Sequence, residues 1–245
     1  MNLRPLILAS VALVTYVFCG CAGAPGRPVA DDIPITPAEF SDFHTLYKQN
    51  CAGCHGTEGK GGAAIALADP VYLAIAGDSV LHDAATSGVV GTSMPAFAKS
   101  AGGLLTAKQV DIIVGGIRQD WSQPNVLEGT NPPPYTPASP GVATRGAGVY
   151  DQYCSSCHGV GGRGATKASS IVDGSFLALL TDQELRTLVI VGRPELGAPD
   201  WRNDVLGKPM SAQEVSDVVA WLSSQRPQFP GQPFPNTPKS AGENR

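Results

Sequence analysis

Cys51-Ala-Gly-Cys54-His55 is repeated 103 residues later as Cys154-Ser-Ser-Cys157-His158. Two cysteines three positions apart lie on one side of a helical turn, so both thiols can reach the two vinyl groups of one porphyrin while the next residue ligates its iron. The alternatives are a disulfide or half of a zinc site, but a closed zinc site needs a second Cys or His pair, which neither repeat has. The sequence therefore predicts two covalently attached haems c.

The N-terminal segment has the pattern of an export signal. Arg4 precedes an apolar run from Leu6 to Phe18, which is too short to span a bilayer but typical of a signal peptide. The run ends in a sequence that resembles a bacterial lipobox, so we expect residues 1–21 to be a signal peptide whose cleavage leaves Cys21 as a lipidated N-terminus. Ordinary cleavage near Ala22 to Ala24 is the alternative. The expected location is the periplasmic side of the bacterial cell envelope, with a lipid anchor in a membrane.

Composition restricts the class of protein. The chain has 245 residues, of which 29 are glycine and 21 are proline, and a formal net charge of −4. This composition fits small domains with long irregular stretches better than one large core. No basic run occurs in the sequence, so nucleic acid is not an expected partner.

Proline marks the expected domain boundary. Six prolines lie between Gln123 and Pro140, a composition that favours extended polyproline II structure and a semi-rigid spacer. The C-terminal segment holds five more prolines and is expected to be disordered. The expected segments after the signal peptide are a tether (22–35), a first domain (36–118), a Pro-rich linker (119–144), a second domain (145–226) and a disordered tail (227–245).

The two domains are expected to be copies of one helical unit. Matching residues recur at offsets that drift slowly from 103 to 105, as in a duplication with few insertions. Four strings have the capping-box pattern that begins helices, and the first is expected to start the helix that leads into Cys51. These strings begin at Thr36, Thr106, Thr181 and Ser211. No segment alternates as a strand does, so the predicted class is all-α, with two helical haem domains joined by the linker.

The order of motifs resembles class I cytochrome c, here duplicated. Each copy has a helix ending in CxxCHG, a glycine-rich loop, a middle helix, a further loop and a capped last helix. In that family the distal ligand is a methionine thioether on the loop before the last helix, and this ligation raises the haem potential. Met94, followed by Pro95, lies on that loop of the first copy. The resemblance thus implies that His55 and Met94 ligate the first iron, whose porphyrin is attached to Cys51 and Cys54.

The second copy departs from the family pattern at the distal ligand. The offset of 104 places Ala198 opposite Met94, and alanine cannot bind iron. Met210 is the remaining methionine of this copy and lies opposite Leu105, directly before the last helix. We expect Met210 to be a relocated ligand. The alternatives are an open or water-bound iron, with Met210 in the core, and ligation by some other side chain. The other expected residues of the second haem site are Cys154, Cys157 and His158.

The resemblance implies an electron-transfer protein rather than an enzyme, carrying single electrons in a bacterial respiratory or photosynthetic chain. Its partners would be redox proteins, namely a membrane complex, a dehydrogenase or a terminal oxidase. One alternative is a fixed cytochrome subunit of a larger membrane oxidoreductase complex. Another is a dihaem peroxidase, which is disfavoured because the second copy has no histidine except His158 and no evident acid/base cluster.

Overall fold

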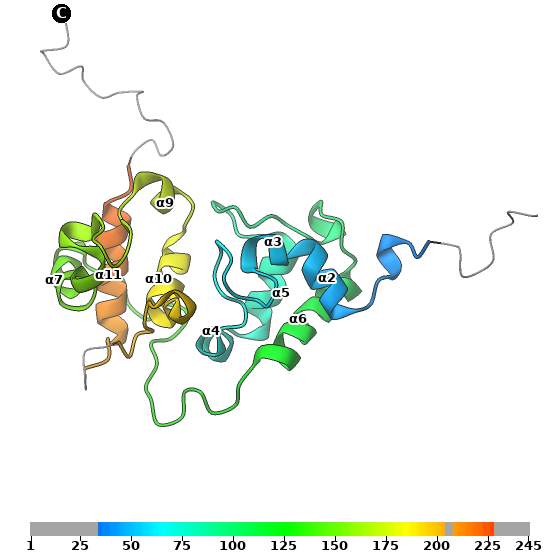
Figure 1. Cartoon of the computed structure of the whole chain (residues 1–245), viewed down its shortest axis with the longest axis horizontal. Helices are drawn as coiled ribbons and strands as arrows, with labels where there is room; N and C mark the ends of the chain where they lie inside the picture. Colours follow the sequence, from blue (N-terminus) through cyan, green and yellow to red (C-terminus); the bar gives the residue numbers. More distant parts are fainter. Residues whose placement is uncertain (1–33, 204–207, 228–245) are drawn as a thin grey trace, which may run out of the picture. The chain divides into compact units, whose positions relative to one another are not determined.

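The computed structural model describes residues 34–203 and 208–227 (Figure 1). The chain separates into two compact units, one ending at Phe40 and one beginning at Ser41, and both haem motifs lie in the second unit. The expected signal peptide, most of the tether and nearly all of the tail lie outside the described residues. The boundaries at 36–118 and 145–226 stay predictions.

The helix that leads into Cys51 begins later than expected. Thr36 forms its capping box, but the box closes only the single 3-10 turn η2 (Pro37–Glu39), because the backbone at Phe40 is extended. The helix itself, α2 (Phe43–Asn50), starts after Asp42, whose carboxylate accepts a hydrogen bond from the Thr45 N–H at 2.7 Å. Aspartate is among the strongest N-caps, so the sequence holds two start signals and the second one begins the helix. The expectation of one helix from Thr36 was wrong.

The other predicted helices are present. The first repeat continues with α3 (Ala52–His55), α4 (Pro70–Ile75), α5 (Asp78–Ser87), η3 (Lys99–Ala101) and α6 (Ala107–Trp121). The second comprises α7 (Ala143–Tyr153), α8 (Ser155–His158), η4 (Val160–Gly162), α9 (Gly174–Ala178), α10 (Asp182–Val191), η5 (Pro194–Leu196) and α11 (Ala212–Ser224). Complete capping boxes at Thr106, Thr181 and Ser211 begin α6, α10 and α11. Among the described residues there is no strand, only two isolated bridges, and the all-α class is confirmed.

In each repeat the first and last helices cross. α2 packs against α6, and α7 packs against α11, which also contacts α10 (Figure 1). A tyrosine from the first helix is buried at each crossing, Tyr47 in the first repeat and Tyr150 in the second. The crossing holds the end of the first helix in place, and each haem motif follows directly after that end.

The linker is held by the second repeat along part of its length. Pro133 is fully buried, and the guanidinium of Arg186 on α10 donates to the carbonyls of Pro134 and Tyr135 at 2.8 and 3.1 Å. Arg186 is itself only 2% exposed and also donates to Ser216 Oγ on α11. A buried guanidinium needs several acceptors, and the linker carbonyls supply them. Residues 133–135 of the linker are therefore packed against α10 and do not form part of a free spacer.

Candidate functional site

The first CxxCH motif forms one additional turn at the end of α2. The N–H of Cys51 closes α2 on the Tyr47 carbonyl at 2.8 Å, and the N–H of His55 bonds the Cys51 carbonyl at 3.0 Å. This turn places both thiols three positions apart on one side, with the imidazole following at once. Gly56 ends it with φ of +85°, and a Cβ there would lie 1.8 Å from the Lys60 carbonyl oxygen, so only glycine fits.

His55 is held in the form that a metal ligand requires. Its Nδ1 lies 2.8 Å from the Ile65 carbonyl oxygen. A carbonyl only accepts hydrogen bonds, so Nδ1 carries the proton and the lone pair is on Nε2, which is free to bind iron. The side chain is buried, and that burial, with a smaller contribution from the positive charge of Arg193, lowers the pKa of His55. The imidazole is therefore neutral at physiological pH, as ligation demands.

The second motif repeats this geometry. The N–H of Cys154 bonds the Tyr150 carbonyl at 2.8 Å, and the N–H of His158 bonds the Cys154 carbonyl at 3.0 Å. His158 Nδ1 lies 3.0 Å from the Ser169 carbonyl oxygen, so its Nε2 is also left for a metal. The two proximal sites therefore share the same backbone geometry, although His55 is buried and His158 is not.

Each site is braced by a tyrosine one turn before the first cysteine. The hydroxyl of Tyr47 donates to the Gly56 carbonyl at 2.8 Å, and that of Tyr150 donates to the Gly159 carbonyl at 2.5 Å. Both rings contact a tryptophan, Trp121 at 5.0 Å between ring centroids and Trp221 at 4.4 Å. Through this tyrosine, the glycine that ends each CxxCH turn is fixed to the point where the first and last helices cross.

The thiols fit covalent haem better than a disulfide or zinc. All four motif cysteines are free in the structure. Burial raises the pKa of Cys51 to about 12 and that of Cys154 to about 11, so both are protonated thiols at neutral pH rather than the thiolates that a zinc site needs. Within residues 34–203 and 208–227, no group of three or more Cys, His, Asp or Glu side chains could hold a metal ion alone. Two free thiols beside one neutral imidazole match the donors that a c-type haem uses.

Met94 lies on a short closed loop between α5 and α6. The N–H of Val89 bonds the Met94 carbonyl at 3.0 Å, and the N–H of Met94 bonds Thr92 Oγ1 at 3.1 Å. The Met94 side chain is partly exposed rather than buried in the core. Its role as distal ligand stays a prediction.

The corresponding loop of the second repeat contains Ala198 in the same place. The N–H of Arg193 bonds the Ala198 carbonyl at 2.9 Å, as Val89 bonds Met94. Met210 instead has the backbone position of Leu105, because its N–H bonds the Trp201 carbonyl at 2.8 Å as that of Leu105 bonds the Phe97 carbonyl at 2.7 Å. Both side chains are buried, at 4% and 6% exposure.

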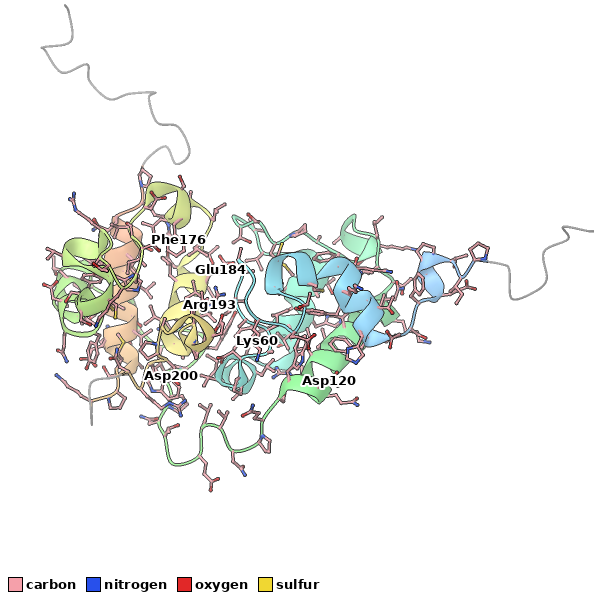
Figure 2. The ribbon with its side chains drawn as sticks, in the orientation of Figure 1. Lys60, Asp120, Phe176, Glu184, Arg193 and Asp200 are labelled. Carbon is pink, nitrogen blue, oxygen red and sulfur yellow. The ribbon has the colours of Figure 1, made fainter. Side chains whose placement is uncertain are left out.

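One residue that sequence reasoning missed is Arg193. It lies on the loop after α10 and donates from Nη2 to the Gly62 carbonyl at 2.8 Å, in the loop between His55 and Ile65 (Figure 2). Its Nε also pairs with Glu195 at 2.6 Å. The available signal was a charged residue, Arg193, at the position that Val89 has in the first repeat.

Comparison with known proteins gives one family. The family model described as "Cytochrome C oxidase, cbb3-type, subunit III" matches residues 38–115 and again 141–222. The chain is 34% identical over 141 residues to the "Cbb3-type cytochrome c oxidase subunit CcoP" of Azospirillum sp. (strain B510), a match that covers 53% of this chain and 42% of that protein. The chain thus matches less than half the length of that relative.

Two solved structures are also similar. A chain of the Kuenenia stuttgartiensis reducing HAO-like protein complex has a TM-score of 0.44 and 19% identity, covering 80% of this chain and 100% of that one. The thiosulfate dehydrogenase of Marichromatium purpuratum has a TM-score of 0.31 and 20% identity, covering 85% of this chain and 52% of that one.

The family matches confirm several expectations. One model matches twice, once on each repeat, which confirms a duplicated class I cytochrome c with two covalent haems and a role in electron transport. The individual iron ligands stay predictions. Cys21, the expected lipidation site, lies outside the described residues.

Proposed function

The chain belongs to the family of cytochrome c oxidase, cbb3-type, subunit III, and on this basis we propose that it carries single electrons on the periplasmic side of a bacterial respiratory chain. The observation that carries the proposal is the pair of equivalent proximal sites, in which Ile65 and Ser169 hold His55 and His158 with Nε2 available. A bound haem supplies the one-electron chemistry. The chain attaches it, holds its ligands and keeps water away.

Different residues of the chain would attach the haem and ligate its iron. Cys51 and Cys54, and Cys154 and Cys157 in the second repeat, fix each porphyrin to the turn after a helix. His55 and His158 would each supply an imidazole nitrogen to one iron atom, and Met94 would supply a thioether to the first. Rigid placement of these groups limits the rearrangement that accompanies each electron transfer, which is what a carrier requires.

A fixed subunit of a larger membrane oxidase is the second candidate. It is favoured by the relative from Azospirillum, which its name describes as an oxidase subunit and of which this chain matches 42%. A terminal oxidase would then be the immediate redox partner. The two candidates differ in whether the protein travels alone, so detergent-solubilised membranes resolved by native electrophoresis and stained for haem distinguish them. A free carrier migrates at the mass of this chain, and a subunit migrates with other chains.

We further propose that a lipid on Cys21 anchors the protein to a membrane. The support is the lipobox-like sequence, together with an apolar run that is too short to span a bilayer. In the part of the chain that the structure describes, no helix is long and apolar enough to cross a membrane.

Haem content tests the central proposal. The intact mass of the purified full-length protein should exceed that of the processed chain by two haems, and a redox titration should show two one-electron steps. Cys51→Ala and Cys154→Ala should each disturb attachment in their own repeat and leave the other haem bound. A wild-type mass without porphyrin, or a single titrating centre, would refute the proposal.

A further inference from the structure

The distal loops of the two repeats have the same backbone register, so Ala198 stands in the place of Met94. Gly88 and Gly192 end the middle helices with φ of +70° and +65°, and a Cβ on either would collide with the backbone of its own distal loop. The next residue of each repeat then bonds the carbonyl five positions on, that of Met94 at 3.0 Å and that of Ala198 at 2.9 Å. The loops start from matched glycines and close on matched bonds, which places Ala198 at the register of Met94. Its neighbours Gly197 and Pro199 have no iron-binding side-chain atom, so a shift of one residue would not supply a ligand either.

Met210 occupies a core position rather than the position of a ligand. Its counterpart in the first repeat, Leu105, is 6% exposed. That repeat has Met94 as well, so the position of Leu105 serves core packing and not iron ligation. Leucine and methionine have similar volumes, and methionine fills such gaps readily. Met210 is 4% exposed and its N–H is tied to the Trp201 carbonyl, so its side chain is already covered by protein.

The second repeat has no evident replacement for the missing thioether. His158 is its only histidine, and Cys154 and Cys157 are used for attachment. Its two lysines, Lys167 and Lys208, are exposed. On the distal loop itself the side chains with oxygen donors are Glu195 and Asp200, and both carboxylates are held in ion pairs, with Arg193 and Arg202.

The charged groups of the distal loop neutralise one another. Arg193 pairs with Glu195 at 2.6 Å, and Arg202 Nε pairs with Asp200 at 3.0 Å. Trp201, between them, is 2% exposed. A loop with paired charges and a buried indole offers no counter-charge to an anionic ligand, so a neutral molecule is the better fit.

We propose that the chain supplies no protein ligand to the distal side of the second haem, and that this position binds a small neutral π-acceptor molecule of the class of carbon monoxide and nitric oxide. The ligand donates an electron pair to the reduced iron, and no bond breaks and no net electron is transferred. The inference rests on the proposed function, because it requires a haem attached at Cys154 and Cys157. It makes the two haems unequal, one closed by Met94 and one open beside Ala198.

Titration of the reduced full-length protein with carbon monoxide, followed by absorbance, tests the inference. The wild type should bind one equivalent per two haems. Ala198→Met should abolish this binding, because it restores a thioether at the register of Met94. Met210→Leu, which copies Leu105, should still bind one equivalent, and Met94→Ala should bind two.

Other results would overturn the inference. If the wild type binds none and Met210→Leu gains one equivalent, Met210 is the distal ligand. If neither binds, another side chain closes the second iron, and if the wild type binds two, the first haem is open as well. Intact masses of the same samples keep failure of the proposed function distinct, because a protein with fewer than two haems refutes dihaem attachment itself.

Discussion

Asp217 joins the first and last helices of the second repeat through a single buried carboxylate. Its Oδ1 accepts from the Val142 N–H at 2.8 Å, at the start of α7, and Arg145 donates to both carboxylate oxygens at 2.7 and 2.8 Å. Gln213 on α11 donates to Oδ1 as well, at 2.9 Å. These bonds, that of Arg145 first, hold the pKa of Asp217 below its usual value.

Asp217→Asn is expected to lower the free energy of unfolding at pH 7 by about 1–3 kcal/mol, since a charge-assisted pair is lost and an amide N–H is turned toward Arg145. The folded pKa lies below the unfolded value of about 3.9. The stabilisation is therefore complete above about pH 4 and is lost as the pH falls through the folded pKa. Thermal unfolding followed by circular dichroism at pH 7 and pH 3 should show a smaller difference in stability between the two proteins at the lower pH.

Asp182→Asn is the matched control for this change. The pKa of Asp182 is also lowered, through hydrogen bonds from Ser223 and Arg226 that outweigh the opposing effect of burial, but its side chain is 64% exposed. Exposed pairs contribute little because water screens them. An equal loss in both variants would mean that burial of Asp217 is not what makes its contacts matter.

The helix crossings of the two repeats are packed in opposite ways. In the first, Phe43 of α2 lies against Gly116 of α6, where a Cβ would meet its ring at 2.2 Å. In the second, the large residue is on the last helix, where Trp221 lies near Gly146 of α7. Phe43 corresponds to Gly146 and Gly116 to Trp221 by the repeat offsets. Each crossing thus pairs one aromatic residue with one glycine, which keeps the volume filled although neither residue is retained.

Gly146→Ala should destabilise the second repeat by about 1–3 kcal/mol or more, because its Cβ would lie 2.0 Å from the Asp217 carbonyl oxygen, and backbone cannot move aside as a side chain can. Gly148→Ala, in the same helix, meets nothing within 4 Å and should be neutral or stabilising by about 0.4–1 kcal/mol. Thermal unfolding of both holoproteins measures the difference. Equal melting temperatures would show that α7 and α11 separate easily at this crossing.

Local signals predicted the helices well, and interactions between distant residues limited the prediction elsewhere. Capping boxes at Thr106, Thr181 and Ser211 depend on residues three positions apart, so they could be read directly. The capping box at Thr36 gave a wrong start for the first helix, because Asp42, six residues later, is the N-cap at which α2 begins. The attachment of the linker to Arg186 could not be predicted, since it joins residues about fifty positions apart through backbone carbonyls that carry no sequence signal.

For the haem sites, too, the sequence predicted some features and not others. The CxxCH motifs and the exchange of Met94 for Ala198 were evident because a repeat allows residue-by-residue comparison. The carbonyls of Ile65 and Ser169, which orient the two proximal histidines, were not, because any residue supplies a carbonyl. The equivalence of Met210 and Leu105 was visible as an offset, but only the matched bonds to Trp201 and Phe97 give it a structural meaning.

The proposed attachment of the chain to a membrane depends on one cysteine of the N-terminal segment, Cys21. Cys21→Ser should remove lipid labelling and leave the protein either unprocessed or soluble after alternative cleavage, because the acyl chains are added to the Cys21 thiol. Cys19→Ser is the control, since Cys19 leaves with the signal peptide and labelling should persist. Fractionation and labelling with a radioactive fatty acid measure both. A soluble wild-type protein that begins after Cys21 would contradict the lipid anchor.

The two repeats also meet through Arg193, which belongs to the second repeat and bonds the first. Its guanidinium donates to the Gly62 carbonyl, and its charge is among the causes that lower the pKa of His55. A positive charge near an iron ligand favours the reduced state, because reduction removes one positive charge from the centre. We therefore expect Arg193 of the second repeat to influence the potential of the first haem through its charge near His55.

Arg193→Gln is expected to lower the reduction potential of the first haem and leave that of the second less affected, as measured by spectroelectrochemical titration of the full-length protein. Arg202→Gln removes the same charge from the same loop. Both arginines pair with a carboxylate of that loop, Arg193 with Glu195 and Arg202 with Asp200, but Arg193 also bonds the Gly62 carbonyl of the first repeat. Arg202→Gln should therefore change the first potential less than Arg193→Gln does. The comparison should be made at low and high salt, because the effect of a partly buried charge persists when the effects of exposed charges are screened. If the two variants shift the first potential equally, net charge explains the effect and the contact between Arg193 and Gly62 has no specific role.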